Sequence, residues 1–267
     1  MLLSTFVFTA GFFASVTVFG NELEEIREAG VITVGVEGTY APFTYHDEDG
    51  TLTGFDVELA ETIAEKLGVE AEFLESGWDS LLAAVDSGRL DTVINDVSVT
   101  EERKEAYDFS DPYLYIPQQV VVPADNEDIK TLEDLDGKTV ATNITNAYAT
   151  ELEKLGLTIV PISTSEEAAT LVVSGRADVC MFSPIILNEY EAQHGEGKLK
   201  VAFRIEGEEE VIAIPVRKGE TELVYAINEI LAELDKEGFL VDLSEKYFGG
   251  DYTKLAEESG EAATEAQ

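Results

Sequence analysis

Hydrophobic and polar positions follow two periods along this chain, which predicts strands separated by helices. The run Val31-Ile32-Thr33-Val34-Gly35-Val36 is apolar and β-branched, as in a buried strand. Apolar residues between Val57 and Leu67 then recur at helical spacing and stop before Gly68, a common residue after a helix. Strands over 69–74 and 92–97 flank a helix over 78–87. This β-α-β-α-β order is typical of a parallel sheet covered by helices.

A second series of the same kind begins near residue 129 and predicts a second lobe. Asp49-Gly50 also predicts a hairpin within the first series. We expect an α/β protein with two lobes, each a mostly parallel sheet flanked by helices, joined by two extended crossings. The second series comprises helices over 132–135, 146–155 and 166–174 and strands over 139–143, 158–161 and 177–182. The expected crossings are 113–123 and 210–215, the returning helices are 220–237 and one around 243–247, lobe 1 is 21–115 plus 211–250, and lobe 2 is 116–210.

The two ends of the chain differ in composition from the lobes. Residues 1–20 carry no charge and precede the acidic run Asn21-Glu22-Leu23-Glu24-Glu25. They predict an export signal peptide or a membrane anchor, although they lack the basic residues with which signal peptides begin. Residues 251–267 are polar and acidic, which predicts a flexible tail.

Acidic residues greatly outnumber basic ones. The chain has 55 Asp and Glu against 17 Lys and Arg, a formal net charge of -38. Nucleic acid is therefore not expected as a partner, because phosphate binding needs clusters of Lys and Arg. The acids are spread along the sequence, so we interpret them as a solvated surface, and we hypothesise that the protein works in high salt, which screens their repulsion.

Residue types that commonly hold metals or act as nucleophiles are scarce. Cys180 is the only cysteine, so no intrachain disulfide can form, and it lies in a predicted buried strand. The histidines His46 and His194 are isolated and have no metal-ligand spacing. A phosphate-binding loop sequence is also missing. We expect no metal and no cofactor.

The candidate site lies where predicted strands end, because ligands of open parallel sheets bind outside the carboxyl ends of the strands. Two such lobes facing each other form a cleft that can close by hinge motion. The segments that follow the strands or begin the next helices are 37–43, 76–78, 95–103, 145–148 and 182–184.

Several of these segments resemble the polar amino-acid binding proteins of ABC importers. The resemblance runs from Ile26 to Tyr252, and GTYAPF with IN-V-VT-ER-YDFS is similar to the cystine-binding branch. It implies a type II periplasmic-binding-protein fold outside the cytoplasm, a monomer that delivers an amino acid to a membrane permease and catalyses no reaction. The motifs are Gly35 to Phe43, Gly54-Phe55-Asp56-Val57, Trp78-Asp79, Asn95 to Arg103, and Tyr107-Asp108-Phe109-Ser110.

In lobe 1 the resemblance implies that Arg103 clamps the ligand's α-carboxylate, which suits a planar guanidinium with paired donors. The alternative is a surface helix arginine paired with Glu101 or Glu102. Ser98 and the backbone of Asp96, beside Asn95, would bond the carboxylate or the ammonium. Ser98 could alternatively cap the helix that begins near Thr100.

For three further positions of lobe 1, the alternatives are again a ligand contact or a structural or surface role. Tyr40 and Trp78 match positions that flank the ligand side chain, or they pack in the core. Glu37 matches an acid at the cleft mouth, or it is one more surface carboxylate. Each pair of alternatives stays open on the sequence alone.

Lobe 2 departs from the family pattern at two places. Thr145-Asn146-Ala147 stands where many relatives have Gly-Thr-Thr or Gly-Thr-Asn, so backbone donors at a helix start would remain. Ser183 stands where the family places the aspartate that pairs with the α-ammonium. Because an unpaired buried ammonium is costly, another acid must replace that aspartate, with Asp96 and Glu37 as candidates, or the ligand has no amino group. A dehydratase acting on prephenate-like acids and a binding protein for an amine-free acid therefore remain as alternatives.

Overall fold

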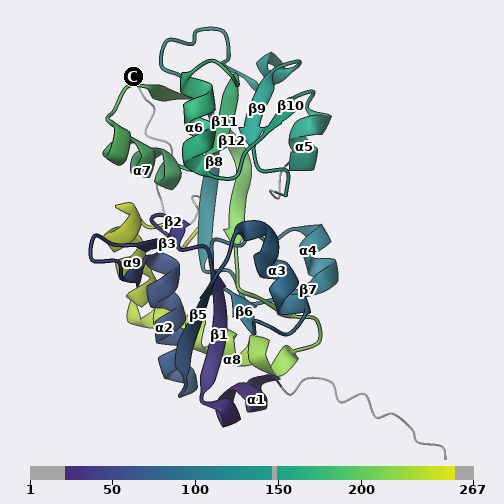
Figure 1. Cartoon of the computed structure of the whole chain (residues 1–267), viewed down its shortest axis with the longest axis vertical. Helices are drawn as coiled ribbons and strands as arrows, with labels where there is room; N and C mark the ends of the chain where they lie inside the picture. Colours follow the sequence, from purple (N-terminus) through teal and green to yellow (C-terminus); the bar gives the residue numbers. More distant parts are fainter. Residues whose placement is uncertain (1–21, 146–148, 256–267) are drawn as a thin grey trace, which may run out of the picture.

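The computed structural model describes residues 22–145 and 149–255, and these form two lobes stacked along the long axis (Figure 1). Each lobe contains a five-stranded sheet, of order β5-β1-β6-β13-β7 in lobe 1 and β10-β9-β11-β8-β12 in lobe 2. In each sheet four strands run in one direction and the fourth in order, β13 or β8, runs against them. The prediction of mostly parallel sheets is confirmed.

The strands of the lobe 1 sheet come from both ends of the chain. A separate three-stranded hairpin sheet, β2-β3-β4, includes the turn at Asp49-Gly50 that the sequence predicts. The bounds are β1 (Val31–Val36), β5 (Glu70–Glu75), β6 (Thr92–Val93), β7 (Tyr107–Phe109) and β13 (Pro215–Arg217), with β2 (Thr39–Tyr40), β3 (Thr44–His46) and β4 (Leu52–Thr53) in the hairpin sheet.

Helices cover this sheet because their apolar faces fit it. Helix α2 ends at Gly68, whose left-handed backbone caps it as expected. Helix α3 can pack closely on β1 because Gly35 has no side chain, and a Cβ there would lie 3.1 Å from Leu81. The helices of lobe 1 are α1 (Glu22–Ala29), α2 (Phe55–Leu67), α3 (Trp78–Asp86), α4 (Glu101–Ala106), α8 (Thr221–Glu237) and α9 (Phe239–Phe248).

Lobe 2 repeats the plan with a smaller set of elements. Cys180 is buried within its β11, in agreement with the expectation of a small apolar core residue. The strands are β8 (Leu114–Pro123), β9 (Thr139–Thr142), β10 (Thr158–Pro161), β11 (Val179–Phe182) and β12 (Leu199–Ile212). The helices are η1 (Leu132–Leu135), α5 (Ala149–Lys154), α6 (Ser165–Val173) and α7 (Pro184–His194).

Two long antiparallel strands, β8 and β12, connect the lobes (Figure 1). They form one ribbon that is interrupted by irregular pairing between Val201 and Phe203 and between Arg204 and Glu209. At the lobe 1 end, Ser98 bridges to Ile212 and Val99 N–H donates to the Val211 carbonyl over 2.8 Å. The loop after β6 is therefore held against the crossing strand.

The structure corrects four details of the sequence prediction. The strand expected over 92–97 stops after Val93, because the chain turns at Asp96, whose φ of 53° lies outside the strand region. Segment 132–135 is a 3₁₀ helix rather than an α-helix. The second crossing begins far earlier than residue 210, since β12 starts at Leu199. Helix α7 was not predicted, because its buried residues Ile185, Ile186 and Leu187 are consecutive rather than periodic.

The ends of the described chain also differ from expectation. Tyr252 and Thr253, which the sequence placed in the flexible tail, pack on lobe 1, where Tyr252 stacks edge-on against Phe248 and its carbonyl accepts from Tyr115 N–H over 2.8 Å. The expected leader at 1–20 and the last part of the tail, 256–267, lie outside the described residues. Among the residues that are described, no helix has the length and apolar character needed to cross a membrane.

Candidate functional site

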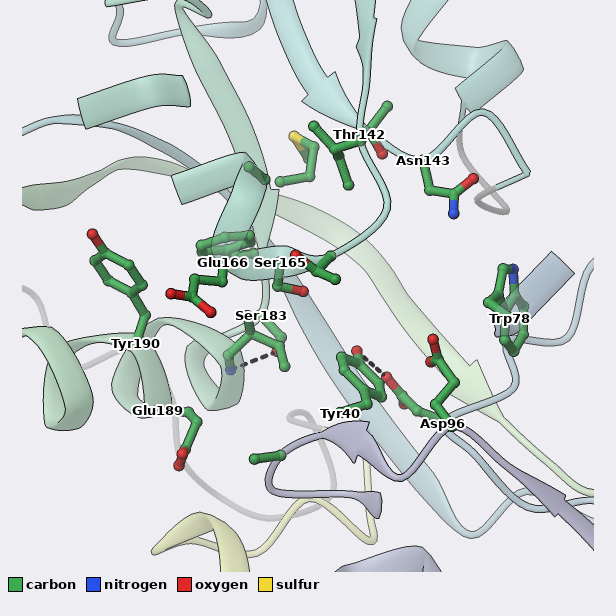
Figure 2. Close-up of a pocket in the computed structure, with 18 of the residues that line it drawn as sticks. Tyr40, Trp78, Asp96, Thr142, Asn143, Ser165, Glu166, Ser183, Glu189 and Tyr190 are labelled. Carbon is green, nitrogen blue, oxygen red and sulfur yellow. Dashed lines mark hydrogen bonds between the residues drawn. The ribbon is translucent and has the colours of Figure 1, made fainter. Parts of the chain in front are cut away.

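A cavity of about 390 Å³ lies between the two lobes beside the β8–β12 ribbon. Both lobes line it, and Figure 2 shows side chains from each pointing into the same space. It includes most of the side chains that the sequence selected. Those that line it are Glu37, Tyr40, Trp78, Asn95, Asp96, Ser98, Arg103 and Ser183.

Arg103 is held at the cavity wall by its own helix and by an aromatic ring. Thr100 caps α4, accepting a hydrogen bond from Arg103 N–H over 3.1 Å. The Arg103 guanidinium lies 5.2 Å from the centre of the Trp78 ring and donates from Nη1 to the Ser98 carbonyl over 2.8 Å. Its side chain is partly buried and lines the cavity, so Arg103 is not a fully exposed surface residue.

The two aromatic residues serve both the core and the cavity. Trp78 begins α3, packs on the buried cluster around Leu81 and lines the cavity with its other surface. Tyr40 stacks on Phe43 with ring centres 5.1 Å apart. Its hydroxyl donates to Asp96 Oδ2 over 2.9 Å (Figure 2). The two alternatives for each residue are therefore compatible.

Asp96 stands on the turn that ends the lobe 1 strand, with the buried Asp56 beneath it. Its N–H donates to Asp56 Oδ2 over 2.7 Å, while Asp56 Oδ1 accepts from the Tyr113 hydroxyl. Burial raises the pKa of Asp56 to about 7. Burial, and then the nearby charges of Glu210 and Asp56, raise the pKa of Asp96 well above its usual range. Asp96 Oδ1 is shielded from solvent and has no hydrogen-bond partner in the described chain.

Glu37 is fixed by Asn95, which is almost wholly buried. The Asn95 amide accepts from Glu37 N–H over 2.8 Å and donates to Glu37 Oε2 over 3.1 Å. Thr44 holds the same Asn95 oxygen over 2.7 Å. Burial raises the pKa of Glu37, whose carboxylate lines the cavity and is not merely a surface group. Asn95 therefore acts here mainly as a support for Glu37.

Ser98 contacts Glu210, a cavity residue that was not predicted from the sequence. Its hydroxyl donates to Glu210 Oε1, and Gln118 Nε2 donates to Glu210 Oε2 over 2.6 Å. The cap of the following helix, α4, is therefore Thr100 and not Ser98. Nothing local marked Glu210, because it is 112 residues from Ser98 and lies in a segment predicted only as a crossing.

The lobe 2 positions behave differently from one another. Ser183 is buried at the cavity wall and caps α7, accepting from Ile186 N–H over 3.2 Å (Figure 2). Thr145 does not line the cavity: its hydroxyl lies 2.8 Å from Asp79 Oδ1 of lobe 1 and 2.9 Å from Asn143 Oδ1 of its own loop, and these two acceptors share its one proton. Asn146 lies outside the described residues.

Lobe 2 also supplies acidic and aromatic side chains that no sequence pattern had marked. Glu166 and Ser165 begin α6, and Glu189 and Tyr190 lie on α7 (Figure 2). With them, the described lining contains five carboxylates, Glu37, Asp96, Glu166, Glu189 and Glu210, against the single arginine Arg103. The described residues form no cluster with metal-binding geometry. The cavity is thus suited to a small ligand that carries a carboxylate together with positive charge.

The chain matches a family model over residues 32–250, that of the bacterial extracellular solute-binding proteins, family 3. It belongs to this family, which makes it a two-lobed solute-binding protein. It is 38% identical over 236 residues to the L-cystine-binding protein TcyA of Bacillus subtilis, an alignment that covers 88% of this chain and 87% of TcyA.

Solved structures show the same fold. An ancestral arginine-binding protein bound to arginine superposes with a TM-score of 0.76 at 38% identity, over 82% of this chain and 99% of that protein. The L-cystine solute receptor of Neisseria gonorrhoeae in its unliganded open conformation gives 0.64 at 36% identity, over 88% and 100%.

Proposed function

We propose that this protein captures a polar amino acid outside the cytoplasm and delivers it to the permease of an ABC importer, with L-cystine as the first candidate ligand. The observation that carries the proposal is Arg103, held over Trp78 in a cavity that both lobes line and that is otherwise acidic. The ligand named for TcyA supports cystine. Work as a monomer and the lack of a nucleic-acid partner belong to the same proposal, and the net charge of -38 supports the second.

In the proposed complex, Arg103 binds the α-carboxylate with paired donors and Trp78 keeps the guanidinium in place. Tyr40 and Trp78 flank the side chain, where aromatic surface suits a disulfide or a carbon chain. Glu37 or Asp96 is available to the ammonium. Hinge motion about the β8–β12 ribbon then closes lobe 2 over the ligand.

A binding protein for an amine-free carboxylic acid is the second candidate, because Ser183 provides no negative charge at the cavity wall. A dehydratase is not favoured, since the relatives reported above are a binding protein and a solute receptor. The ligands expected for the two binding functions differ only in the amino group. Pairs of ligands with and without that group therefore distinguish the two functions.

Thermal unfolding of the purified protein in high salt tests the proposal. Ligand at about a thousandfold over its dissociation constant stabilises by about 4 kcal/mol, which shifts the midpoint clearly. We expect L-cystine or another polar L-amino acid to produce this shift. A shift only with amine-free acids would support the second candidate, and no shift with either class would reject the proposed function.

A further inference from the structure

Two carboxylates from distant parts of the chain meet at the wall of the cavity where the β8–β12 ribbon joins lobe 1. Asp96 stands on the turn after β6, and Glu210 lies near the end of β12. Pairing of the two segments brings them together: Val99 N–H donates to the Val211 carbonyl over 2.8 Å, and Ala213 N–H donates to the Val97 carbonyl over 3.2 Å. The pairing of these two segments therefore brings together two carboxylates that are far apart in the sequence.

The hydrogen bonds around these carboxylates leave one acceptor open. Tyr40 donates to Asp96 Oδ2, whereas Asp96 Oδ1 is shielded from solvent and has no partner among the described residues. Ser98 and Gln118 donate to the two oxygens of Glu210. A buried oxygen without a donor is unfavourable, and more so when the group is charged. An ammonium group, with three N–H donors and a positive charge, can donate to that oxygen and offsets part of the negative charge of the two carboxylates.

Burial raises the pKa of both carboxylates, and the charges around them modify that effect. Burial and the charges of Glu210 and Asp56 raise the pKa of Asp96, to which Glu37 also contributes. Burial raises the pKa of Glu210, although the Ser98 hydrogen bond and Arg103 lower it in part. The groups around the two carboxylates are Glu37, Tyr40, Asp56, Ser98, Arg103, Tyr113, Gln118 and one another. Without ligand, both carboxylates therefore favour the protonated form more than exposed carboxylates do.

At the corresponding wall of lobe 2, Ser183 offers no charge, and the two lobe 2 carboxylates that line the cavity, Glu166 and Glu189, lie on α6 and α7. The Ser183 hydroxyl is neutral and is occupied by Ile186 N–H. Building on the amino-acid binding proposed above, we propose that Asp96 and Glu210 together form the counter-charge for the ligand's α-ammonium. Lobe 1 and the adjoining end of the β8–β12 ribbon then hold both charged groups of the amino acid, with Arg103 on the carboxylate, and the rest of lobe 2 contacts the side chain.

Glu210→Gln tests the assignment with little disturbance of the fold, because glutamine can still accept from Gln118 and donate to Ser98. The matched control is Glu209→Gln, on the neighbouring position of β12, which does not line the cavity. Dissociation constants are measured for L-arginine, L-glutamine and L-cystine, and for the amine-free partners 5-guanidinopentanoate and glutaramate. We expect Glu210→Gln to raise the dissociation constants of those amino acids that bind the wild type by tenfold or more. The dissociation constants of the amine-free acids should not change, and Glu209→Gln should change neither set.

Two further measurements separate a charge role from a structural one. Aspartate at position 183 can still cap α7, so Ser183→Asp combined with Glu210→Gln is expected to recover part of the lost affinity. Calorimetry in phosphate and in Tris, whose ionisation enthalpies differ, is expected to show release of protons when an amino acid binds to the wild type. Glu210→Gln is expected to reduce that release.

The outcomes separate the two proposals. If no amino acid binds the wild type, the proposed function itself fails. If amino acids bind but Glu210→Gln weakens amine-bearing and amine-free ligands equally, or neither, the ammonium assignment is overturned while the proposed function stands. Binding without proton release, together with no recovery by Ser183→Asp, also overturns the assignment.

Discussion

Arg103 shows how a single side chain is prepared for a carboxylate. The Thr100 cap fixes the start of its helix, the Ser98 carbonyl accepts from Nη1, and the Trp78 ring lies beneath the guanidinium. A planar group held in this way can present paired donors without losing further side-chain freedom. Lysine keeps the charge but has neither the plane nor the fork.

We therefore expect Arg103→Lys to weaken binding of the amino-acid ligand by tenfold or more while changing the unfolding midpoint of the ligand-free protein little. Arg89→Lys is the matched control, because Arg89 is an exposed arginine bonded to Ser87 and does not line the cavity. Isothermal titration of both variants with the ligand found by thermal unfolding measures the effect. Equal affinities for Arg103→Lys and wild type would remove Arg103 from the carboxylate site.

The residues predicted from sequence share one property: they stand in short motifs whose local order determines where they lie. Arg103, Trp78 and Tyr40 were found this way, and each lines the cavity. Glu210 was missed because its role depends on pairing with a loop 112 residues away. The lobe 2 residues Glu189 and Tyr190 were missed because they lie on α7, which was itself not predicted.

At the scale of elements, the loop after β9 and the start of α3 form a contact between the lobes. Thr145 was predicted to bind ligand at a helix start, but its hydroxyl donates to Asp79 across the cleft. Local sequence could indicate a polar loop at this strand end, and it could not indicate which lobe the hydroxyl would face. The bond is exposed, so it is expected to contribute about 0.5–1.5 kcal/mol to the closed arrangement.

If the bond favours closure, Thr145→Val and Asp79→Ala should each weaken ligand binding about two- to tenfold, because less of the protein is in the binding-competent state. The double variant should be no weaker than either single variant, since both remove the same interaction. Affinities and solution scattering of the four proteins measure the effect and the opening of the cleft. Additive losses would instead mean that Thr145 and Asp79 act separately, as they would if Thr145 contacted the ligand.

At the scale of the whole molecule, the overall plan was predictable because it rests on repeated periodic segments. The alternation of strands and helices in two series gave the two lobes, and both sheets have the same strand plan. The crossing β12 was only partly predicted, because Gly207 and a run of glutamates make much of it look like a loop. Its pairing with β8 overrides that local preference.

The net charge of -38 leads to a prediction about salt and pH together. Repulsion among carboxylates opposes the compact state and is screened by salt, so about 1 M NaCl is expected to raise the unfolding midpoint at pH 7.5 by about 5 °C or more.

Asp56 makes the stability depend on pH as well. Burial raises its pKa to about 7 in the folded protein, against an ordinary value near 3.8. The stability that Asp56 contributes is therefore present below pH 4 and is lost as the pH rises through 7.

Lowering the pH from 8 to 5 should therefore stabilise the ligand-free protein, and salt should stabilise it less at pH 5 than at pH 8 because fewer buried and crowded carboxylates remain charged. Thermal unfolding across this grid of pH and NaCl measures both effects. Asp56→Asn is the matched variant: it should flatten part of the pH dependence, since its amide does not titrate, and leave the salt dependence unchanged. A midpoint that does not respond to salt at pH 8 would contradict the interpretation of the acidic surface as an adaptation to high salt.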